Sequence, residues 1–237
     1  MYHQIKYSFL KRAIDTGFKV PDLVTTQRFG NEELLELVRL INQNNLIKAR
    51  GGTARDHETA TICQVHAAIF PQLTLPTPVL YINAQGTDQA CQKSDTGSTF
   101  NIPTATLSFN MIHKLLRSGI PGDSIIFTSA YKTQTELHRT LKSALTEDIS
   151  PEDAHQIAAV RCSTVDSFMG EEAPYHIHDS ASRAGRVYLE PSRAVVLCSR
   201  AKLGFMLIGS NAALNNCHDT FRFDHPCKVI VRHLSWC

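Results

Sequence analysis

Two arginines and a pair of glutamates are the residues of this chain whose types and spacing best suit chemistry. Glu171 and Glu172 end the stretch "STVDSFMGEE", and Arg193 and Arg200 lie seven residues apart in "EPSRAVVLCSRAK". Seven residues are two helical turns, so a helix here places both guanidinium groups on one face. Apolar residues separate them, and an arginine on a packed helix is costly unless it meets an anion. Two interpretations stay open: the arginines bridge the glutamates, or they bind phosphate, for which arginine geometry is suited.

The elements that must hold these residues form an alternating series. Short apolar runs predict strands at 79–84, 124–130, 157–168 and 204–210. Apolar residues at helical spacing predict helices at 104–119, 131–145 and 189–202. Strands that alternate with helices need crossover connections, so the predicted fold class is α/β with a mostly parallel sheet flanked by helices. Ligands of such sheets bind at the carboxyl ends of the strands, and "DSFMGEE" leaves one of these ends.

The rest of the chain has less regular patterns. A short helix is predicted at 5–16, and a clearer one follows Asn31, whose side chain can cap it. The apolar residues of that second helix repeat at helical spacing: Leu34, Leu37, Val38 and Ile41. The polar, glycine-rich run 50–60 predicts a loop, and the residues around 150–155 predict a linker. Residues 85–101 have no periodicity, which predicts a long, mobile polar insertion.

Composition limits the function classes. The chain has 237 residues, 43% of them hydrophobic, and 24 Lys and Arg against 22 Asp and Glu, for a formal charge of +2. This balance argues against a strongly basic nucleic-acid coat but is compatible with a local basic groove. The seven scattered cysteines are typical of a reduced, intracellular protein. No apolar stretch is long enough for a signal peptide or a membrane span, so we expect a nuclear or cytoplasmic protein with no membrane partner.

Residues 162–172 and 190–209 together resemble motifs V and VI of superfamily 1 DNA and RNA helicases, of the nonsense-mediated-decay and Okazaki-processing type. That family typically reads "ST-V-D-S/A-F-Q-G-x-E" and then "D-P-x-R-x-N-V-A-x-T-R-A-K-x-G-x-x-x-x-G", where this chain has STVDSFMGEE and EPSRAVVLCSRAKLGFMLIG. The stretch "SIIFTSAYKTQTELHRTL" is similar to the family's strand that ends in T-P-Y-K-x-Q before a helix. The stretch "SFLKRAIDTGFKVPDLVTTQRFGNEEL" resembles the segment that connects the two motor lobes.

The resemblance implies the second RecA-like lobe, with the P-loop NTPase fold, of a two-lobe motor. Residues 1–22 would be a connector from the first lobe, and 23–237 the C-terminal lobe with an insertion at about 85–101. ATP lies between the lobes in that family, with Mg held by the first lobe. The implied partners are single-stranded DNA or RNA and the first RecA-like lobe.

The resemblance also implies a role for individual residues at the nucleotide. Arg200 would be the arginine finger that stabilises charge on the transferred γ-phosphate. Arg28 would be a second phosphate-contacting arginine, Glu172 would contact the ribose, and Arg193 would support the site. Three more residues of the matching motifs are expected at the nucleotide: Gly170, Tyr131 and Gln134.

Residues of the same motifs are implied at the nucleic acid. Ser163, Thr164 and Ser129 would face the strand, since small hydroxyls position a phosphate backbone without reading its sequence. The turn after Thr164 would then couple the nucleotide on one side to the strand on the other.

The chain departs from the family pattern at several positions. Met169 replaces the glutamine of motif V, Val195 replaces the asparagine of motif VI, and Ser199 replaces the threonine before the finger. Near the connector, the order Gln27-Arg28-Phe29 replaces the family's glutamine-aromatic-arginine, so the role of Arg28 depends on a one-residue choice of alignment. These changes affect the expected coupling between nucleotide and strand more than the expected fold.

The sequence also contains no G-x-x-x-x-G-K-[ST] phosphate loop and no Asp-Glu strand end after one. A chain without these parts cannot hold Mg-ATP and orient water by itself. We therefore expect a C-terminal motor half, cut from a longer protein or left by a truncated gene, that hydrolyses no ATP alone. The alternative is a degenerate helicase-like lobe that acts as a non-catalytic nucleic-acid or protein interaction module.

Other chemical residues are given structural interpretations. The spacing of the C-terminal cysteines and histidines matches no common zinc finger, so no metal site is predicted. His176 and His178 share one face of a predicted strand, which we interpret as a solvated face rather than a ligand pair. Cys162 and Cys198 are interpreted as small buried hydrophobes.

Overall fold

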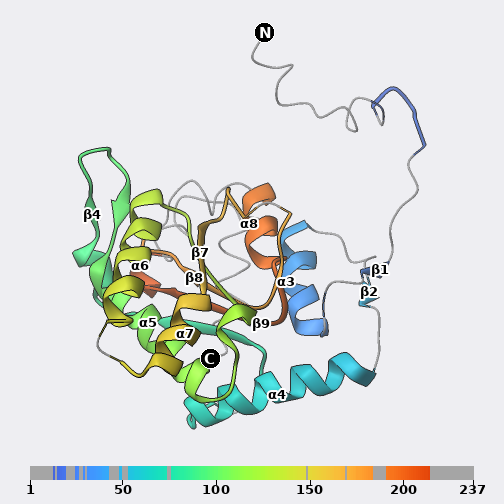
Figure 1. Cartoon of the computed structure of the whole chain (residues 1–237). Helices are drawn as coiled ribbons and strands as arrows, with labels where there is room; N and C mark the ends of the chain where they lie inside the picture. Colours follow the sequence, from blue (N-terminus) through green and yellow to red (C-terminus); the bar gives the residue numbers. More distant parts are fainter. Residues whose placement is uncertain are drawn as a thin grey trace.

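The structure, a computed structural model, describes residues 13, 15–19, 25–26, 29, 31–42, 48–49, 53–73, 76–147, 149–168, 170–183 and 191–213. At its centre is a five-stranded sheet with the strand order β3-β9-β8-β6-β7 (Figure 1). Its strands are β3 (Val79–Asn83), β6 (Ile125–Ser129), β7 (Arg161–Thr164), β8 (Ala173–Asp179) and β9 (Ala201–Gly209). Every neighbouring pair in this sheet is parallel, which confirms the predicted α/β class with a mostly parallel sheet.

Helices cover both faces of the sheet, which explains why its central strands are buried over most of their length. On one face lie α3 (Glu32–Asn42) and α8 (Pro191–Cys198), and their buried residues pack against Phe205 and Leu207 of β9. The predicted start of α3 is confirmed, because the Asn31 side chain accepts a hydrogen bond from the Leu34 N–H at 2.8 Å.

The other face carries α4 (Thr53–Ile69), α5 (Ile102–Arg117), α6 (Lys132–Leu145) and, beside α6, α7 (Pro151–Ala159). Met111 and Leu115 of α5 are buried, as its periodicity predicts, and Gly119 ends the helix region with φ at 90°. In β8, Tyr175 and Ile177 point to this face of the sheet and pack in the same apolar cluster. The two helical layers therefore bury the sheet between them.

Two predicted irregular stretches are helical. The loop predicted at 50–60 is wrong from residue 53 onward, because α4 begins there. Its second half buries Ile62 and Val65 against the sheet. This packing stabilises a helix that also includes the polar first half. The linker predicted around 150–155 is also wrong. Ser150 caps α7 by accepting from the Asp153 N–H at 3.1 Å, and the strand predicted at 157–168 shrinks to β7.

The insertion at 85–101 is regular rather than structureless, which corrects the prediction. It forms a 3-10 turn, η1 (Thr87–Ala90), and then a hairpin of β4 (Gln92–Lys93) and β5 (Thr99–Phe100). A second short 3-10 turn, η2 (Gly122–Ser124), precedes β6.

At the N-terminal side, β1 (Thr25–Thr26) pairs with β2 (Lys48–Ala49). The predicted helix at 5–16 and the predicted connector at 1–22 lie largely outside the described residues. Among the helices that the structure describes, none has the length and apolarity to cross a membrane.

Candidate nucleotide and strand site

Arg200 lies at the amino end of the sheet, on the two-residue turn between α8 and β9. Its Nη1 donates a hydrogen bond to the Glu171 backbone oxygen at 3.1 Å, and its own carbonyl accepts one from the Ala173 N–H at 3.0 Å. Because α8 ends at Cys198, Arg200 is not on the helix, and the predicted face shared with Arg193 is wrong. Arg193 lies in the first turn of α8, and its side chain is outside the described part of the structure.

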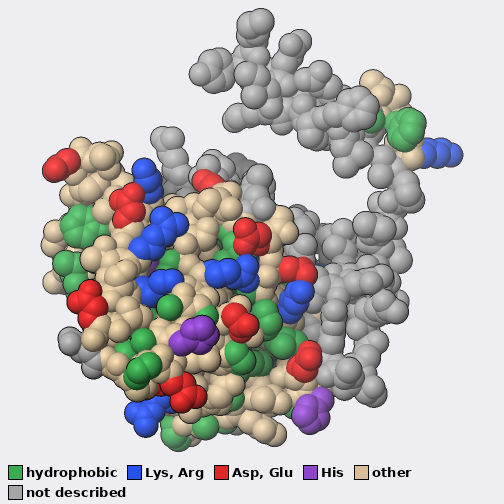
Figure 2. Space-filling view, viewed as in Figure 1, with side chains coloured by type: hydrophobic (Ala, Val, Ile, Leu, Met, Phe, Trp, Pro, Cys, Tyr) green, Lys and Arg blue, Asp and Glu red, His purple; other side chains and the backbone are tan. Residues whose placement is uncertain are grey.

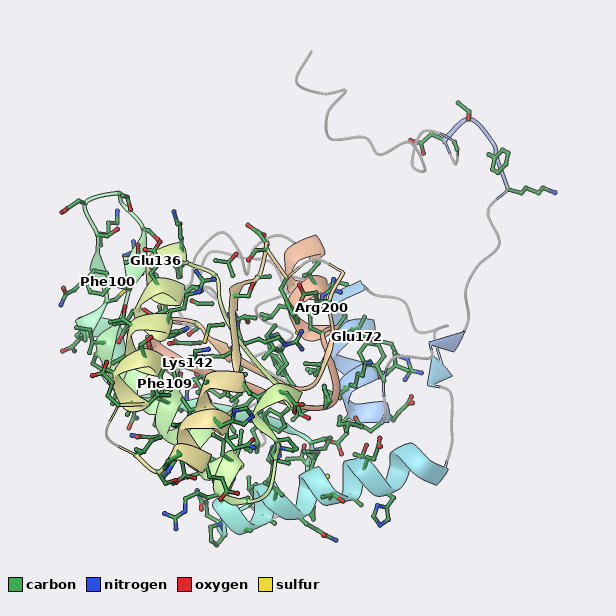
Figure 3. All side chains as sticks on the ribbon, viewed as in Figure 1. Phe100, Phe109, Glu136, Lys142, Glu172 and Arg200 are labelled. Atoms are coloured by element: carbon green, nitrogen blue, oxygen red, sulfur yellow. The ribbon has the colours of Figure 1, made fainter. Side chains whose placement is uncertain are left out.

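The paired glutamates form ion pairs around Arg200. The Glu171 carboxylate contacts Arg161 Nη1 at 3.1 Å, and Glu172 Oε1 contacts Lys202 Nζ at 2.5 Å. In Figure 3, Arg200 and Glu172 lie together beside α8 and α3. Of the two interpretations of the sequence, bridging of the glutamates is seen for other cations: Arg161 pairs with Glu171 and Lys202 pairs with Glu172, while Arg200 binds the backbone oxygen of Glu171. Binding of phosphate by the arginines stays a prediction.

Charge on the face that Figure 2 presents is mixed. Acidic and basic side chains alternate over it, and they do not form a wide patch of one sign. A strand bound on this face would therefore depend on a few placed groups more than on a broad positive field.

Hydroxyl groups gather at the opposite, carboxyl end of β7. Thr164 Oγ1 lies 2.7 Å from Ser167 Oγ, and Ser163 Oγ lies 2.8 Å from the same atom, in a partly exposed cluster. Ser129, at the end of β6, is instead fully buried and donates to the Asp179 carbonyl at 2.9 Å. The structure thus brings Ser163 and Thr164 together at an accessible edge, with Ser129 beneath it.

The segment 165–172 connects these two ends of the sheet. It leaves the carboxyl end of β7 and returns along the sheet to the amino end of β8, since β6 pairs in parallel with both strands. Phe168 is buried in this segment under the Arg161 guanidinium, whose carbon lies 5.8 Å from the ring centre. Gly170 has φ at 88°, a left-handed conformation that favours glycine. The segment "DSFMGEE" thus leaves a carboxyl end as predicted, and its last two residues, Glu171 and Glu172, lie at the amino end of β8.

Tyr131 and Gln134 lie near the start of α6, by the carboxyl end. The Tyr131 N–H donates to Ser129 Oγ at 3.4 Å. Gln134 is fully buried, and its amide binds the carboxylate of Asp179 at 2.6 Å and the backbone of Asn101. These two residues are thus at the opposite end of the sheet from Arg200, and Arg28 is outside the described residues.

The two strand histidines are buried, which corrects the prediction of a solvated face. Thr128 Oγ1 lies 2.8 Å from His176 Nε2 and 2.8 Å from His178 Nδ1. Burial lowers the pKa of His176 to about 3 and the pKa of His178 well below its ordinary value. No group of three or more His, Cys, Asp or Glu side chains suited to a metal occurs in the part of the chain that the structure describes.

Sequence reasoning missed several residues of these sites. At the amino end they are Arg161 and Lys202, and at the carboxyl end they are Asn101, His138 and Asp179. Lys202 follows Arg200 closely enough to have been included. Asp179 carried a signal as well, because a charged residue directly after an apolar strand of an α/β sheet falls where ligands or buried networks lie.

The parallel sheet between two layers of helices defines a RecA-like α/β fold of the P-loop NTPase class. A sequence-family model described as an AAA domain matches residues 5–212. The chain therefore belongs to this AAA domain family and is a helicase-like AAA domain. A search of curated proteins finds no match.

Proteins of this family generally bind nucleotide with Mg. At the amino end, the guanidinium of Arg200 and the ammonium of Lys202 are N–H donors with the charge that phosphate requires. Arg200 is only 8% exposed, so its reach to a ligand is short. The donor set fits a phosphate group, and the described residues supply no ligand set for the metal ion.

Proposed function

We propose that this chain is the C-terminal motor lobe of an ATP-dependent superfamily 1 helicase of the nonsense-mediated-decay and Okazaki-processing type. It would act on single-stranded DNA or RNA together with a first RecA-like lobe that holds Mg-ATP. In this proposal Arg200 is the arginine finger, with Glu172 toward the ribose and Arg193 and Arg28 in support.

One contact carries the proposal. The Arg200 guanidinium is held by the Glu171 carbonyl at 3.1 Å, and Glu171 ends the segment that begins at the hydroxyls of Ser163 and Thr164. A shift of that segment at one end of the sheet would be felt at the other, because the connection is short and Val165 and Phe168 anchor it in the core. A motor needs a connection of this kind between the bound nucleic acid and the bound nucleotide.

The residues of this chain would have distinct tasks. Bound ATP supplies a γ-phosphoryl group on which negative charge develops during transfer. Arg200 would stabilise that charge, and its bond to Glu171 fixes the guanidinium without taking up all of its donors. Ser163 and Thr164 would bind phosphate oxygens of the strand and so orient it across the edge of β7.

A second candidate is a non-catalytic binding module, and a specific observation favours it. The glutamates at the amino end already have cationic partners within the chain, Arg161 and Lys202, and Arg200 is mostly buried. An interaction module would keep this arrangement for stability alone. The two candidates differ in whether phosphate competes for Arg200 and Lys202.

The test is binding of a labelled homopolymeric single strand of roughly 16 nucleotides, titrated between about 50 and 200 mM salt. The motor proposal expects affinity to fall with salt and to fall further, at any one salt, in a Ser163→Glu variant. The exposed Ser143→Glu variant on α6 is the charge-matched control. Binding that is absent, or that is equal in both variants, would contradict a strand site at β7.

A parallel measurement addresses the nucleotide. In the motor assembled with the first RecA-like lobe, fluorescent ATP should bind more weakly when this chain carries Lys202→Gln than when it carries Arg117→Gln, since Arg117 is exposed at the end of α5. Strand binding without any nucleotide effect would favour the interaction module.

A further inference from the structure

Asp179, the last residue of β8, has a carboxylate with no exposed surface. Its Oδ2 accepts hydrogen bonds from Gln134 Nε2 at 2.6 Å and from His138 Nε2 at 2.9 Å, and its Oδ1 accepts one from the Ala181 N–H at 2.7 Å. Burial lowers the pKa of His138, so the neutral imidazole donates through a protonated Nε2. Among the residues that the structure describes, no Lys or Arg pairs with Asp179, and three neutral N–H groups hold the charge.

A carboxylate held in this way lowers the stability of the fold compared with a neutral residue at the same place. Burying an anion without a cation costs more than burying a neutral side chain of similar shape. Its three donors come from two different segments, two from α6 and one from the loop after β8. The carboxylate therefore ties α6 to that loop.

The loop that Asp179 holds has an unusual backbone. Ala181 and Ser182 have φ at 53° and 50°, in the left-handed region that non-glycine residues rarely adopt. The Asn101 side chain donates to the Ala181 carbonyl at 3.1 Å, and Arg183 of the same loop is exposed. The Tyr131 hydroxyl reaches the Arg183 carbonyl at 3.5 Å, so the loop borders the start of α6.

The insertion is joined to the same point. The Asn101 N–H donates to Gln134 Oε1 at 2.7 Å, and Gln134 Nε2 donates back to the Asn101 carbonyl at 3.1 Å. Ser98 of the hairpin accepts from the Thr133 N–H at 3.2 Å, in the first turn of α6. Figure 1 shows the hairpin beside this helix. The Asp179 carboxylate thus contacts α6 and the loop after β8 directly, and Gln134 links it to the end of the insertion at Asn101.

We infer that Asp179 is a positioning residue for the strand-contacting edge: its carboxylate fixes the start of α6, the loop 180–183 and the end of the insertion relative to one another. This role rests on the proposed function, because that function puts a nucleic-acid strand across the carboxyl ends of β6 and β7. Asp179 itself is buried and touches no strand. It sets where Tyr131 and Arg183 lie when the strand arrives.

The test compares three variants of the 237-residue chain. Asp179→Asn replaces one acceptor oxygen by an NH2 group that must face an N–H donor. The double variant Asp179→Asn/Gln134→Glu exchanges amide and carboxylate across the 2.6 Å contact and restores that donor-acceptor pair. It loses the bond that Gln134 Nε2 donates to the Asn101 carbonyl and requires His138 to accept at Nε2, so its recovery is partial. Tyr175→Phe is the control, because it removes a buried hydrogen bond to His66 from the same strand, near its opposite end.

Two readouts are needed. The first is affinity for the labelled single strand, which we expect to weaken roughly 5- to 30-fold in Asp179→Asn, to recover in part in the double variant and to stay unchanged in Tyr175→Phe. The second is the rate of tryptic cleavage after Arg183 relative to cleavage after exposed Arg117. This ratio should rise in Asp179→Asn and return toward the wild-type value in the double variant.

The outcomes separate the positioning role from the proposed function. Wild-type strand binding in Asp179→Asn, or equal losses in Asp179→Asn and Tyr175→Phe, would overturn the positioning role while leaving strand binding intact. If the unaltered chain binds no single-stranded nucleic acid, the proposed function fails. The cleavage ratio alone then tests whether Asp179 fixes the loop. An unchanged ratio would then show that Asp179 does not fix the loop.

Discussion

The Arg200 guanidinium donates a hydrogen bond to the backbone oxygen of Glu171 at 3.1 Å. The residue proposed to meet phosphate is therefore held by the segment that begins at Ser163 and Thr164, whose hydroxyls are proposed to contact the nucleic acid. The neighbouring Ala173 N–H donates to the Arg200 carbonyl at 3.0 Å. The two contacts fix both the side chain and the backbone of Arg200 at the start of β9. A substitution that disturbs this contact should therefore change both the position of the Arg200 guanidinium and the positive charge at the proposed phosphate site.

The first prediction concerns Arg200. In the motor assembled with the lobe that carries the phosphate loop, Arg200→Ala should lower ATP turnover by about 10³-fold or more, since an arginine finger contributes charge only in the transition state. The loss of the hydrogen bond to the Glu171 carbonyl should by itself cost the fold about 1 kcal/mol. Steady-state ATPase rates and urea unfolding measure the two effects. Arg117→Ala is the control, and turnover near the original rate in Arg200→Ala would show that Arg200 is no finger.

The second prediction concerns Gly204, a glycine of the motif VI stretch. A Cβ atom here would lie 2.7 Å from the ring of Tyr175 and 2.9 Å from Ile62, both on the buried face of the sheet. Gly204→Ala should therefore destabilise the chain by about 1 to 3 kcal/mol, as overpacking does. Urea unfolding tests this, and the cost should shrink in a Tyr175→Leu background, where the ring is absent. An equal cost in both backgrounds would mean that the ring is not the obstacle.

The third prediction concerns acid stability. Burial lowers the pKa of His66 from 6.5 to about 4, so the unfolded chain binds a proton between these pH values while the folded chain does not. Stability from this residue is complete above about pH 6.5 and falls as pH drops toward 4, by about 3 kcal/mol in total. His176, whose pKa burial lowers to about 3, adds a loss of the same sign.

Unfolding free energies between pH 8 and 4.5 measure this effect. A His66→Gln variant should have a shallower pH dependence than the unaltered chain, whereas the exposed His155→Gln variant serves as the control. A flat profile in the unaltered chain would rule out neutral, buried histidines.

The fourth prediction concerns thiol reactivity. Burial raises the pKa of the Cys198 thiol to about 12 and that of Cys162 to about 11, so little thiolate exists at pH 8 in either. Iodoacetamide at pH 8, followed by peptide mapping, should modify partly exposed Cys91 long before Cys198. In urea the two should react at similar rates. Fast labelling of Cys198 in the folded chain would contradict its burial at the end of α8.

The sheet was predictable because its information is local. Each strand is a short run of β-branched, aromatic and aliphatic residues, and runs that alternate with helices have few arrangements other than a parallel sheet. The cap of α3 at Asn31 was equally local. The start of α7 carried its own signals, Ser150 followed by a proline and two acids, and the prediction of a linker overlooked them.

The first half of α4 could not be predicted in the same way. Its sequence is polar, and it is helical because the second half packs Ile62 and Val65 against the sheet. The burial of His176 and His178 also depends on distant residues, since Thr128 of another strand supplies their hydrogen-bond partner. Alternation along a strand indicates which residues share a face, but only the layers packed on the sheet decide whether that face meets water.

The sequence by itself determined the α/β class, the alternation of its main strands and helices, and the residue types available to bind phosphate and nucleic acid. The tertiary structure decided which of them meet. It separated Arg200 and Glu172 from Ser163 and Thr164 by the length of a parallel sheet, ended α8 before Arg200, and brought Asp179, Gln134 and Asn101 into one buried network. The reason is physical: local patterns depend on neighbours along the chain, whereas strand pairing and the burial of charge depend on residues that only folding brings together.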